Sequence, residues 1–263
     1  MSTPAGDAPA RPVHRPFLST AALALAILAI VLVGIGGPGT RFGWWHFRTG
    51  FTLMKYGAYL GVAAVVVALI AAILSRRALS RTGFAVALLA LLIGLTAWFL
   101  PWNWRRGAGK VPPIHDITTD TRTPPPLVFS RAMRDSVQGM NPWEYEGDSI
   151  AALQRKAYPD VQPVMLAMTP DSAFGVAYQA ARDMGWTIND VRRDELTVEA
   201  SDVTGWYGFV DDVVIRVTPA SGIARVDVRS VSRVGRSDIG MNAKRIRRYI
   251  AALKARGGEA AGG

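Results

Sequence analysis

The sequence predicts a membrane protein in which three transmembrane α-helices precede a soluble α+β domain, with an antiparallel sheet of about four strands and two helices packed on one of its faces. Three observations support this fold class. Charged residues make up only 19% of the chain, whereas an average soluble protein has roughly 25%. The N-terminal part contains three long uncharged runs. The C-terminal part contains strand patterns between two helical patterns.

The membrane anchor is predicted from the three apolar runs, at residues 18–36, 56–74 and 84–100. A transmembrane helix needs roughly 17–25 apolar residues, so each run can cross a bilayer. Basic residues flank the runs and tryptophans lie at their ends, as they do at membrane interfaces. We therefore expect an N-terminal tail over residues 1–17 and a three-helix anchor over residues 18–101.

Two alternatives apply to these runs. Three buried helices of a soluble core would look similar, but three uncharged runs so close together exceed what such a core needs. The first run could be a cleaved signal peptide, because Arg11 and Arg15 form a basic region before it. The run is longer than the usual stretch of about 7–15 residues, and no A-x-A cleavage site follows it. A retained anchor is therefore favoured.

The net charge of +10 lies mostly around the anchor. Residues 1–109 contain ten basic residues and one acidic residue, giving +9, whereas residues 110–263 have a net charge of +1. A basic chain first suggests nucleic-acid binding, but loop charge around membrane spans explains this excess. We therefore expect no nucleic-acid partner. The absence of cysteine excludes disulfides and thiolate metal sites.

The orientation in the membrane is predicted from the basic loops. With a cytoplasmic N-terminus, the inside loops carry five basic residues and the outside loops carry six, so the count is a draw. The loop at residues 75–82 contains three arginines, which is the densest cluster. Placing this loop in the cytoplasm predicts an inner-membrane protein with an extracytoplasmic C-terminal domain, and the opposite orientation stays open.

Beyond the anchor we expect a linker over residues 102–113, a soluble α+β domain over residues 114–256 and a flexible tail over residues 257–263. The first half of the domain is rich in proline, which favours extended chain and turns. One short helix is expected in this half, at residues 148–157.

The second half of the domain has the pattern helix, four strands, helix. Thr169 followed by Pro170 is typical of a helix start, and Gly185 is typical of its end. The last helix is expected to begin at Ser237 as its N-cap and to end at the glycine pair 257–258. An antiparallel sheet with both helices on its apolar face satisfies this pattern. The four strand segments are 186–191, 196–201, 213–218 and 225–229.

Four short segments of this domain carry a family resemblance. They are Ile114–Asp120, which precedes a proline pair, Ala157–Pro163, Asp211–Val217 and Ser232–Asn242. Together they resemble the domain-of-unknown-function 1499 family over about residues 110–256. The resemblance implies a bacterial or plastid envelope-type protein. It implies no activity.

A first candidate site lies at the start of the domain, where His115, Asp116 and Asp120 occur close together. One imidazole and two carboxylates could bind a hard cation or carry out acid–base chemistry. On an extended chain, however, His115 and Asp116 point to opposite faces, and the segment supplies too few ligands for a metal. The alternative is a turn in which Asp and Thr side chains bond to the backbone. We expect neither a metal nor a cofactor.

A second candidate site is the loop that leads into the last helix. Residues 225–256 carry ten basic and two acidic residues. Arg233 and Arg236 precede a helix N-terminus, where free amides and guanidinium groups can bind a phosphate or a lipid headgroup. The alternative pairs these arginines with acidic residues across the sheet, such as Asp211 and Asp212. The predicted ligand-binding group is Arg233, Arg236, Ser237, Asp238, Asn242 and Arg245.

The chain contains no P-loop, dinucleotide-binding, serine-hydrolase or zinc-protease motif. We therefore expect a non-catalytic cell-envelope protein whose domain binds an anionic ligand, a lipid headgroup, an envelope component or a membrane-protein partner at the membrane surface. The alternative is a membrane-tethered hydrolase that uses His115, Asp116 and Asp120, which would have to converge in one cleft with Arg233 or Arg236. A purely structural scaffold is a third hypothesis.

Overall fold

The computed structural model describes residues 17–78 and 80–257, which divide into two compact units. The second unit begins at Arg105, near the end of the third helix. Each unit is considered by itself below. Outside the described residues lie most of the predicted tails, 1–17 and 257–263, together with Gly258 of the glycine pair expected to end the last helix.

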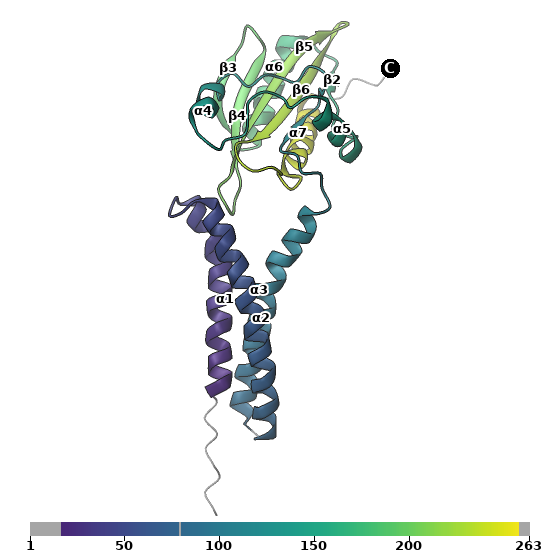
Figure 1. Ribbon diagram of the computed structural model, residues 1–263. Helices are drawn as coiled ribbons and strands as arrows, with labels where there is room; N and C mark the ends of the chain where they lie inside the picture. Colours follow the sequence, from purple (N-terminus) through teal and green to yellow (C-terminus); the bar gives the residue numbers. More distant parts are fainter. Residues whose placement is uncertain (1–16, 79, 258–263) are drawn as a thin grey trace, which may run out of the picture. The chain divides into compact units, whose positions relative to one another are not determined.

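Three helices of 25, 31 and 28 residues are each long and apolar enough to cross a membrane. Each of the three predicted apolar runs lies within one of them, so the prediction of three membrane-capable helices is confirmed. A bilayer core about 30 Å thick needs about 20 helical residues, and all three helices exceed that length. The helices are α1 (Phe17–Arg41), α2 (Phe47–Arg77) and α3 (Arg81–Ala108) (Figure 1).

Small residues form the contacts between these helices. A Cβ atom added at Gly57 of α2 would lie 2.9 Å from the carbonyl oxygen of Ala29 in α1. A Cβ atom added at Gly61 would lie 2.8 Å from the carbonyl oxygen of Gly94 in α3. Large apolar side chains such as Leu92 are exposed instead. Small residues inside and large apolar residues outside are the arrangement expected of helices surrounded by lipid.

The second unit contains a six-stranded antiparallel sheet in the order β1-β6-β5-β4-β3, with β2 also paired to β6. The four predicted strand segments correspond to β3, β4, β5 and β6. The two other strands have three residues each and share the remaining edge of β6. The predicted antiparallel sheet is therefore confirmed, with six strands. They are β1 (Asp116–Thr118), β2 (Val164–Leu166), β3 (Thr187–Arg192), β4 (Thr197–Val203), β5 (Val210–Ala220) and β6 (Ile223–Ser232).

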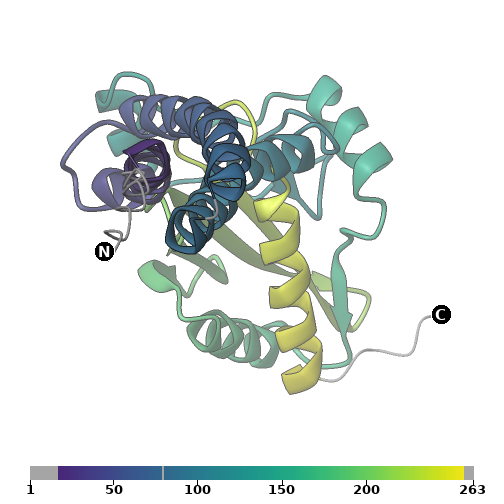
Figure 2. The ribbon, with the colours of Figure 1, turned by 90° about the horizontal axis from the view of Figure 1, so that it is seen from below.

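Two helices, α6 (Pro170–Asp183) and α7 (Met241–Gly257), lie side by side on one face of this sheet (Figure 2). Tyr249 of α7 is fully buried in the core between helices and sheet, and its hydroxyl donates to the carbonyl of Ala177 at 3.1 Å. Burial raises the pKa of this phenol well above its ordinary value, so the hydroxyl keeps the proton that it donates. The core also includes Phe174, Trp186, Val213, Ile215, Val217, Ile246 and Leu253.

The last helix begins later than predicted. Ile239 and Gly240 have positive φ angles, 54° and 76°, so the backbone is left-handed where a helix starting at Ser237 would be right-handed. Helix α7 therefore starts at the next residue. The prediction of Ser237 as the N-cap is wrong. The carboxylate of Asp238 instead accepts hydrogen bonds from the amides of Gly240 and Asn242, at 2.8 and 2.7 Å.

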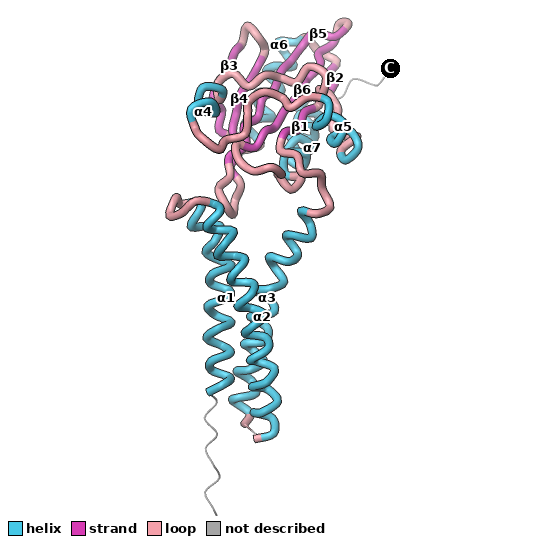
Figure 3. The backbone as a smooth tube through the Cα atoms, in the orientation of Figure 1, coloured by secondary structure: helices cyan, strands magenta, loops and turns pink. Residues whose placement is uncertain are grey.

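The proline-rich half of the domain crosses the other face of the sheet (Figure 3). We call residues 119–147 the proline-rich cover. It contains the short helix α4 (Arg131–Ser136) and leads into α5 (Asp148–Ala157), the short helix that the sequence predicts. Leu127 of the cover packs against Val214 of β5 in a small apolar cluster. The polar face of the sheet is thus buried beneath this cover.

Candidate functional site

A buried ion pair fastens the proline-rich cover to the sheet. Arg229 of β6 and Asp116 of β1 are 2.7 Å apart, and each side chain is only 2% exposed. The same guanidinium donates to the carbonyls of Pro125 and Trp143 in the cover, at 3.1 and 3.0 Å. Because its donors are directed at these groups, Arg229 joins two strands and the cover.

Two other buried carboxylates have the same role. Asp212 of β5 accepts from Arg134 of α4 and from Arg233, each at 2.7 Å. Glu199 of β4 accepts from the amides of Val128 and Phe129 in the cover, at 2.7 and 2.9 Å. A buried charge is tolerated when it is paired and hydrogen-bonded. Buried charged side chains on the polar face of the sheet therefore hold the proline-rich cover in place.

The predicted ligand-binding group is divided between the two faces of the sheet. Arg233 lies on the cover side, bound to Asp212. Arg245 of α7 lies on the helix side, where it pairs with Asp211 at 2.6 Å and with Asp202 at 2.7 Å. These two arginines thus follow the alternative in which they pair with acidic residues of the sheet.

The rest of this group surrounds the start of α7. Asn242 is fully buried and donates to the hydroxyl of Ser232 at 3.0 Å. The carboxylate of Asp238 occupies the free amides of the helix, which is where an external anion would bind. Ser237 accepts a hydrogen bond from the amide two residues later. Arg236 is exposed and has no ion pair within the described part of the chain. Ligand binding by this group stays a prediction.

The residues of the first candidate site do not converge in one cleft. His115 is buried, and its carbonyl accepts from the amide of Ser232 at 2.9 Å. Asp116 is held on the cover side by Arg229. Asp120 forms a turn, because its carboxylate accepts from the backbone amides of the residues two and three positions later, at 3.0 Å each. The geometry that the hydrolase alternative requires is therefore not found for these three residues.

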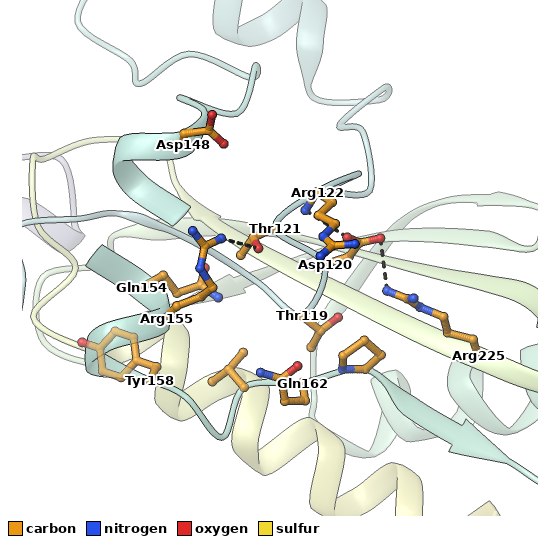
Figure 4. Close-up of a pocket in the computed structure, with 12 residues that line it drawn as sticks. Thr119, Asp120, Thr121, Arg122, Asp148, Gln154, Arg155, Tyr158, Gln162 and Arg225 are labelled. Atoms are coloured by element: carbon orange, nitrogen blue, oxygen red, sulfur yellow. Dashed lines mark hydrogen bonds and ion pairs between the residues drawn. The ribbon is translucent and has the colours of Figure 1, made fainter. Parts of the chain in front are cut away.

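A pocket of about 730 Å³ opens beside Asp120 (Figure 4). Three segments distant in the sequence build it: the loop after β1, helix α5 with the loop that follows it, and one side chain of β6. Most of the lining is polar. The lining residues are Thr119, Asp120, Thr121, Arg122, Asp148, Gln154, Arg155, Tyr158, Val161, Gln162, Pro163 and Arg225.

Three arginines give the pocket its electrostatic character. Arg225 pairs with Asp120 at 3.2 Å and with Asp227 at 2.9 Å, and the hydrogen bond to Asp227 is the main cause that raises its pKa. Arg155 donates to the neutral hydroxyl of Thr121, at 3.1 Å, and Arg122 is exposed. Within residues 17–78 and 80–257, no carboxylate forms an ion pair with Arg122 or Arg155.

Helix α5 is fixed against the floor of this pocket. Gln154 accepts from the amide of Thr118 at 3.0 Å and donates to its carbonyl at 2.6 Å, so this buried glutamine continues the backbone pairing of β1. Thr119 donates to Asp227 at 3.1 Å on the opposite side. Because Gln154 immediately precedes Arg155 on α5, these hydrogen bonds fix the backbone position from which the Arg155 side chain extends.

Metal binding finds no candidate in the described residues, since no group of three or more His, Asp or Glu side chains is placed to hold an ion. Comparison with known families finds a match over most of this domain. The family described as Protein of unknown function (DUF1499) matches residues 116–253, more than half of the chain. The chain belongs to the DUF1499 family. No curated protein matches it.

The DUF1499 domain runs from β1 into α7 and includes every residue that lines the pocket, whereas the three membrane-capable helices precede it. Of the pocket residues, only Asp120 was predicted from the sequence as part of a candidate site. Arg122, Arg155 and Arg225 were missed, because their proximity depends on the pairing of β1 with β6 and on the position of α5. No local pattern around these arginines signals a common site.

Proposed function

We propose that this protein is a membrane-anchored, non-catalytic binding protein whose DUF1499 domain holds a small anion, with phosphate or carboxylate groups, in the pocket beside α5. The observation that carries this proposal is the pair of pocket arginines, Arg122 and Arg155, whose guanidinium groups have no carboxylate partner among the described residues. A guanidinium group is a planar donor that matches both carboxylate and phosphate oxygens.

The size and lining of the pocket support a hydrophilic ligand. Sites for small molecules occupy about 300–1,000 Å³, and this pocket of about 730 Å³ lies in that range. Such sites are mainly apolar, whereas this lining is dominated by charged, amide and hydroxyl side chains. A ligand would exchange its hydration for hydrogen bonds to these groups, which suits a charged solute or headgroup.

The carboxylates of the pocket leave the positive charge of these two arginines uncompensated. Asp120 is neutralised by Arg225 and Arg216, each at 3.2 Å, and by the amides of its own turn. Asp148 is exposed at the first position of α5. The guanidinium groups of Arg122 and Arg155 therefore keep a positive charge that no ion pair among the described residues offsets, and we assign the ligand a negative charge.

Binding to the full-length protein in lipid nanodiscs tests this proposal. We expect isothermal titration with inorganic phosphate or with citrate, at constant ionic strength, to show saturable binding. Arg122→Gln combined with Arg155→Gln should weaken this binding at least tenfold, about 1.4 kcal/mol. The matched control is Arg182→Gln combined with Arg248→Gln, which removes two exposed arginines of α6 and α7 that lie outside the pocket.

The control pair should leave the affinity unchanged. Equal weakening by the two double variants would show that the anion responds to net charge alone, and the pocket assignment would then fail. Absence of saturable binding of both anions to the unmodified protein would also contradict the proposal.

A further inference from the structure

Three segments of the second unit meet at one end of its sheet. Val203 pairs with Val210 across the β4–β5 turn, and Asp116 at the start of β1 pairs with Val231 near the end of β6. The antiparallel register therefore places the start of β1, the β4–β5 turn and the β6–α7 loop together (Figure 3). We call this the linker end of the domain. It comprises residues 109–115, 203–210 and 233–241.

Hydrogen bonds fasten these segments to one another. The amide of Asp238 donates to the carbonyl of Ile114 at 3.1 Å, and the amide of Arg233 donates to the carbonyl of Val210 at 3.1 Å. The linker, the turn and the loop thus form one continuous surface.

The length of the linker limits how far this end can lie from the end of α3. Helix α3 ends at Ala108, and Ile114 is already bonded to the β6–α7 loop. The residues between them reach roughly 20 Å when fully extended. This limit follows from chain length alone, so it holds for every orientation of the domain on its membrane helices.

The exposed side chains at the linker end combine an aromatic anchor with positive charge. Trp206 at the β4–β5 turn is 52% exposed, and Met241 is 43% exposed. Lys110, Arg236 and Lys244, which follows in the first turn of α7, are also exposed, and none forms an ion pair within the described part of the chain. Tryptophan favours the membrane interface, and basic side chains favour anionic headgroups.

The acidic residues at this end are engaged internally. Asp202 and Asp211 pair with Arg245, and Asp238 accepts from the helix amides. The surface charge here is therefore positive.

We propose that the linker end of the domain docks on the bilayer spanned by the protein's own helices, with Trp206 in the interface and Lys110, Arg236 and Lys244 against anionic headgroups. The occupant is the lipid surface itself. The docking surface shares no residue with the lining of the pocket beside α5, so it stands or fails independently of the proposed anion binding.

The chain has no cysteine, so one introduced thiol gives a unique probe. In full-length protein, Val203→Cys places a fluorophore at an exposed position, 47% accessible, beside the β4–β5 turn and leaves Trp206 in place. The control is Asp194→Cys, an exposed position in the β3–β4 turn at the opposite end of the sheet. Proteoliposomes carry spin-labelled lipids in both leaflets, so the sidedness of insertion does not affect the result.

With phosphatidylglycerol in the vesicles, we expect the label at position 203 to be quenched severalfold more than the label at position 194. Trp206→Ala should lower the quenching at position 203, which tethering alone would not predict. Replacing Lys110, Arg236 and Lys244 by Gln should abolish the difference between phosphatidylglycerol and pure phosphatidylcholine vesicles.

Equal quenching at the two positions would overturn the proposal, and so would quenching at position 203 that neither set of substitutions changes. The pocket variant Arg122→Gln with Arg155→Gln should leave the quenching as it is. That result separates docking of the linker end from anion binding in the pocket.

Discussion

At the scale of single residues, the buried carboxylates of the domain serve as connectors. Asp212 illustrates this, because one carboxylate holds Arg134 of the cover and Arg233 of the β6–α7 loop. The value of such a group depends on its surroundings. A buried pair is costly to break because the remaining charge is left unpaired, whereas an exposed pair contributes little.

We therefore expect Asp212→Ala to lower the free energy of unfolding of the domain by about 3–5 kcal/mol, since Arg134 would remain buried without a counter-charge. Asp160→Ala breaks the exposed pair with Arg247 and should cost less than about 1 kcal/mol. Amide hydrogen exchange of β5 in nanodiscs measures both effects. Similar losses for the two variants would contradict the connecting role of Asp212.

Asp238 gives a prediction about pH. Burial, the largest cause, raises the pKa of its carboxyl above the ordinary value, while the amides of Asn242 and Gly240 partly oppose the shift. The folded state then binds this proton more readily than the unfolded chain, so ionisation of Asp238 costs stability at neutral pH and that cost disappears as the pH falls through its folded pKa.

Measured against Asp238→Asn, the unmodified protein should therefore gain relative stability as the pH is lowered from about 7 toward 4. Urea denaturation of both proteins across this range measures the difference, in which the titration of the other carboxylates cancels. A stability difference that does not change with pH, or that changes in the opposite direction, would contradict a raised pKa for Asp238 in the folded protein.

At the scale of elements, two glycines of the domain should respond in opposite ways to substitution by alanine. Gly240 has a φ of 76°, and an added Cβ there would lie 3.4 Å from the hydroxyl of Tyr158. Gly175 in α6 has open space around it. We expect Gly240→Ala to cost about 1–2 kcal/mol of stability, and Gly175→Ala to add about 0.4–1 kcal/mol by restricting the unfolded chain. Thermal unfolding of the two variants should shift in opposite directions.

Gly61 decides how closely α2 and α3 approach. A Cβ there would meet the carbonyl oxygen of Gly94 at 2.8 Å, whereas a Cβ at Gly34 of α1 would meet nothing within 4 Å. Gly61→Ala should therefore loosen the helix contact and lower the resistance of the anchor to detergent, and Gly34→Ala should not. Equal behaviour of these variants in a graded detergent series would sink this account of the packing.

The sequence predicts those elements that are long enough for their apolar pattern to repeat. The four long strands, α5 and α6 were predicted because their apolar spacing extends over several residues or their ends carry capping signals. Strands β1 and β2 have three residues each, too few to show alternation. The start of α7 was misplaced because a serine resembles an N-cap, while the left-handed Ile239 gives no signal in the sequence.

At the scale of the whole molecule, the site could not be predicted from the sequence in the way the fold class was. Each apolar run and each strand pattern lies within one short stretch of the chain, so it can be recognised in the sequence. The pocket joins Arg122, Arg155 and Arg225 from separate segments, and the partners that neutralise Arg233 and Arg245 also lie across the sheet. Charge counting located a basic region correctly but could not tell which arginines were already engaged.

The pairing of β1 with β6 bears on the order in which the molecule assembles. Asp116 and Arg229 are 113 positions apart, and long-range pairing of this kind is slow because the intervening chain must first be ordered. Pulsed hydrogen exchange during refolding should protect the β5–β6 hairpin before β1, and simultaneous protection would contradict this order.

In biosynthesis, the first strand would therefore emerge already tethered to an inserted membrane helix and would wait for its partner. Until β1 and β2 pair with it, the outer edge of β6 is open to strands of other chains. The two shortest strands of the sheet thus close the outer edge of β6.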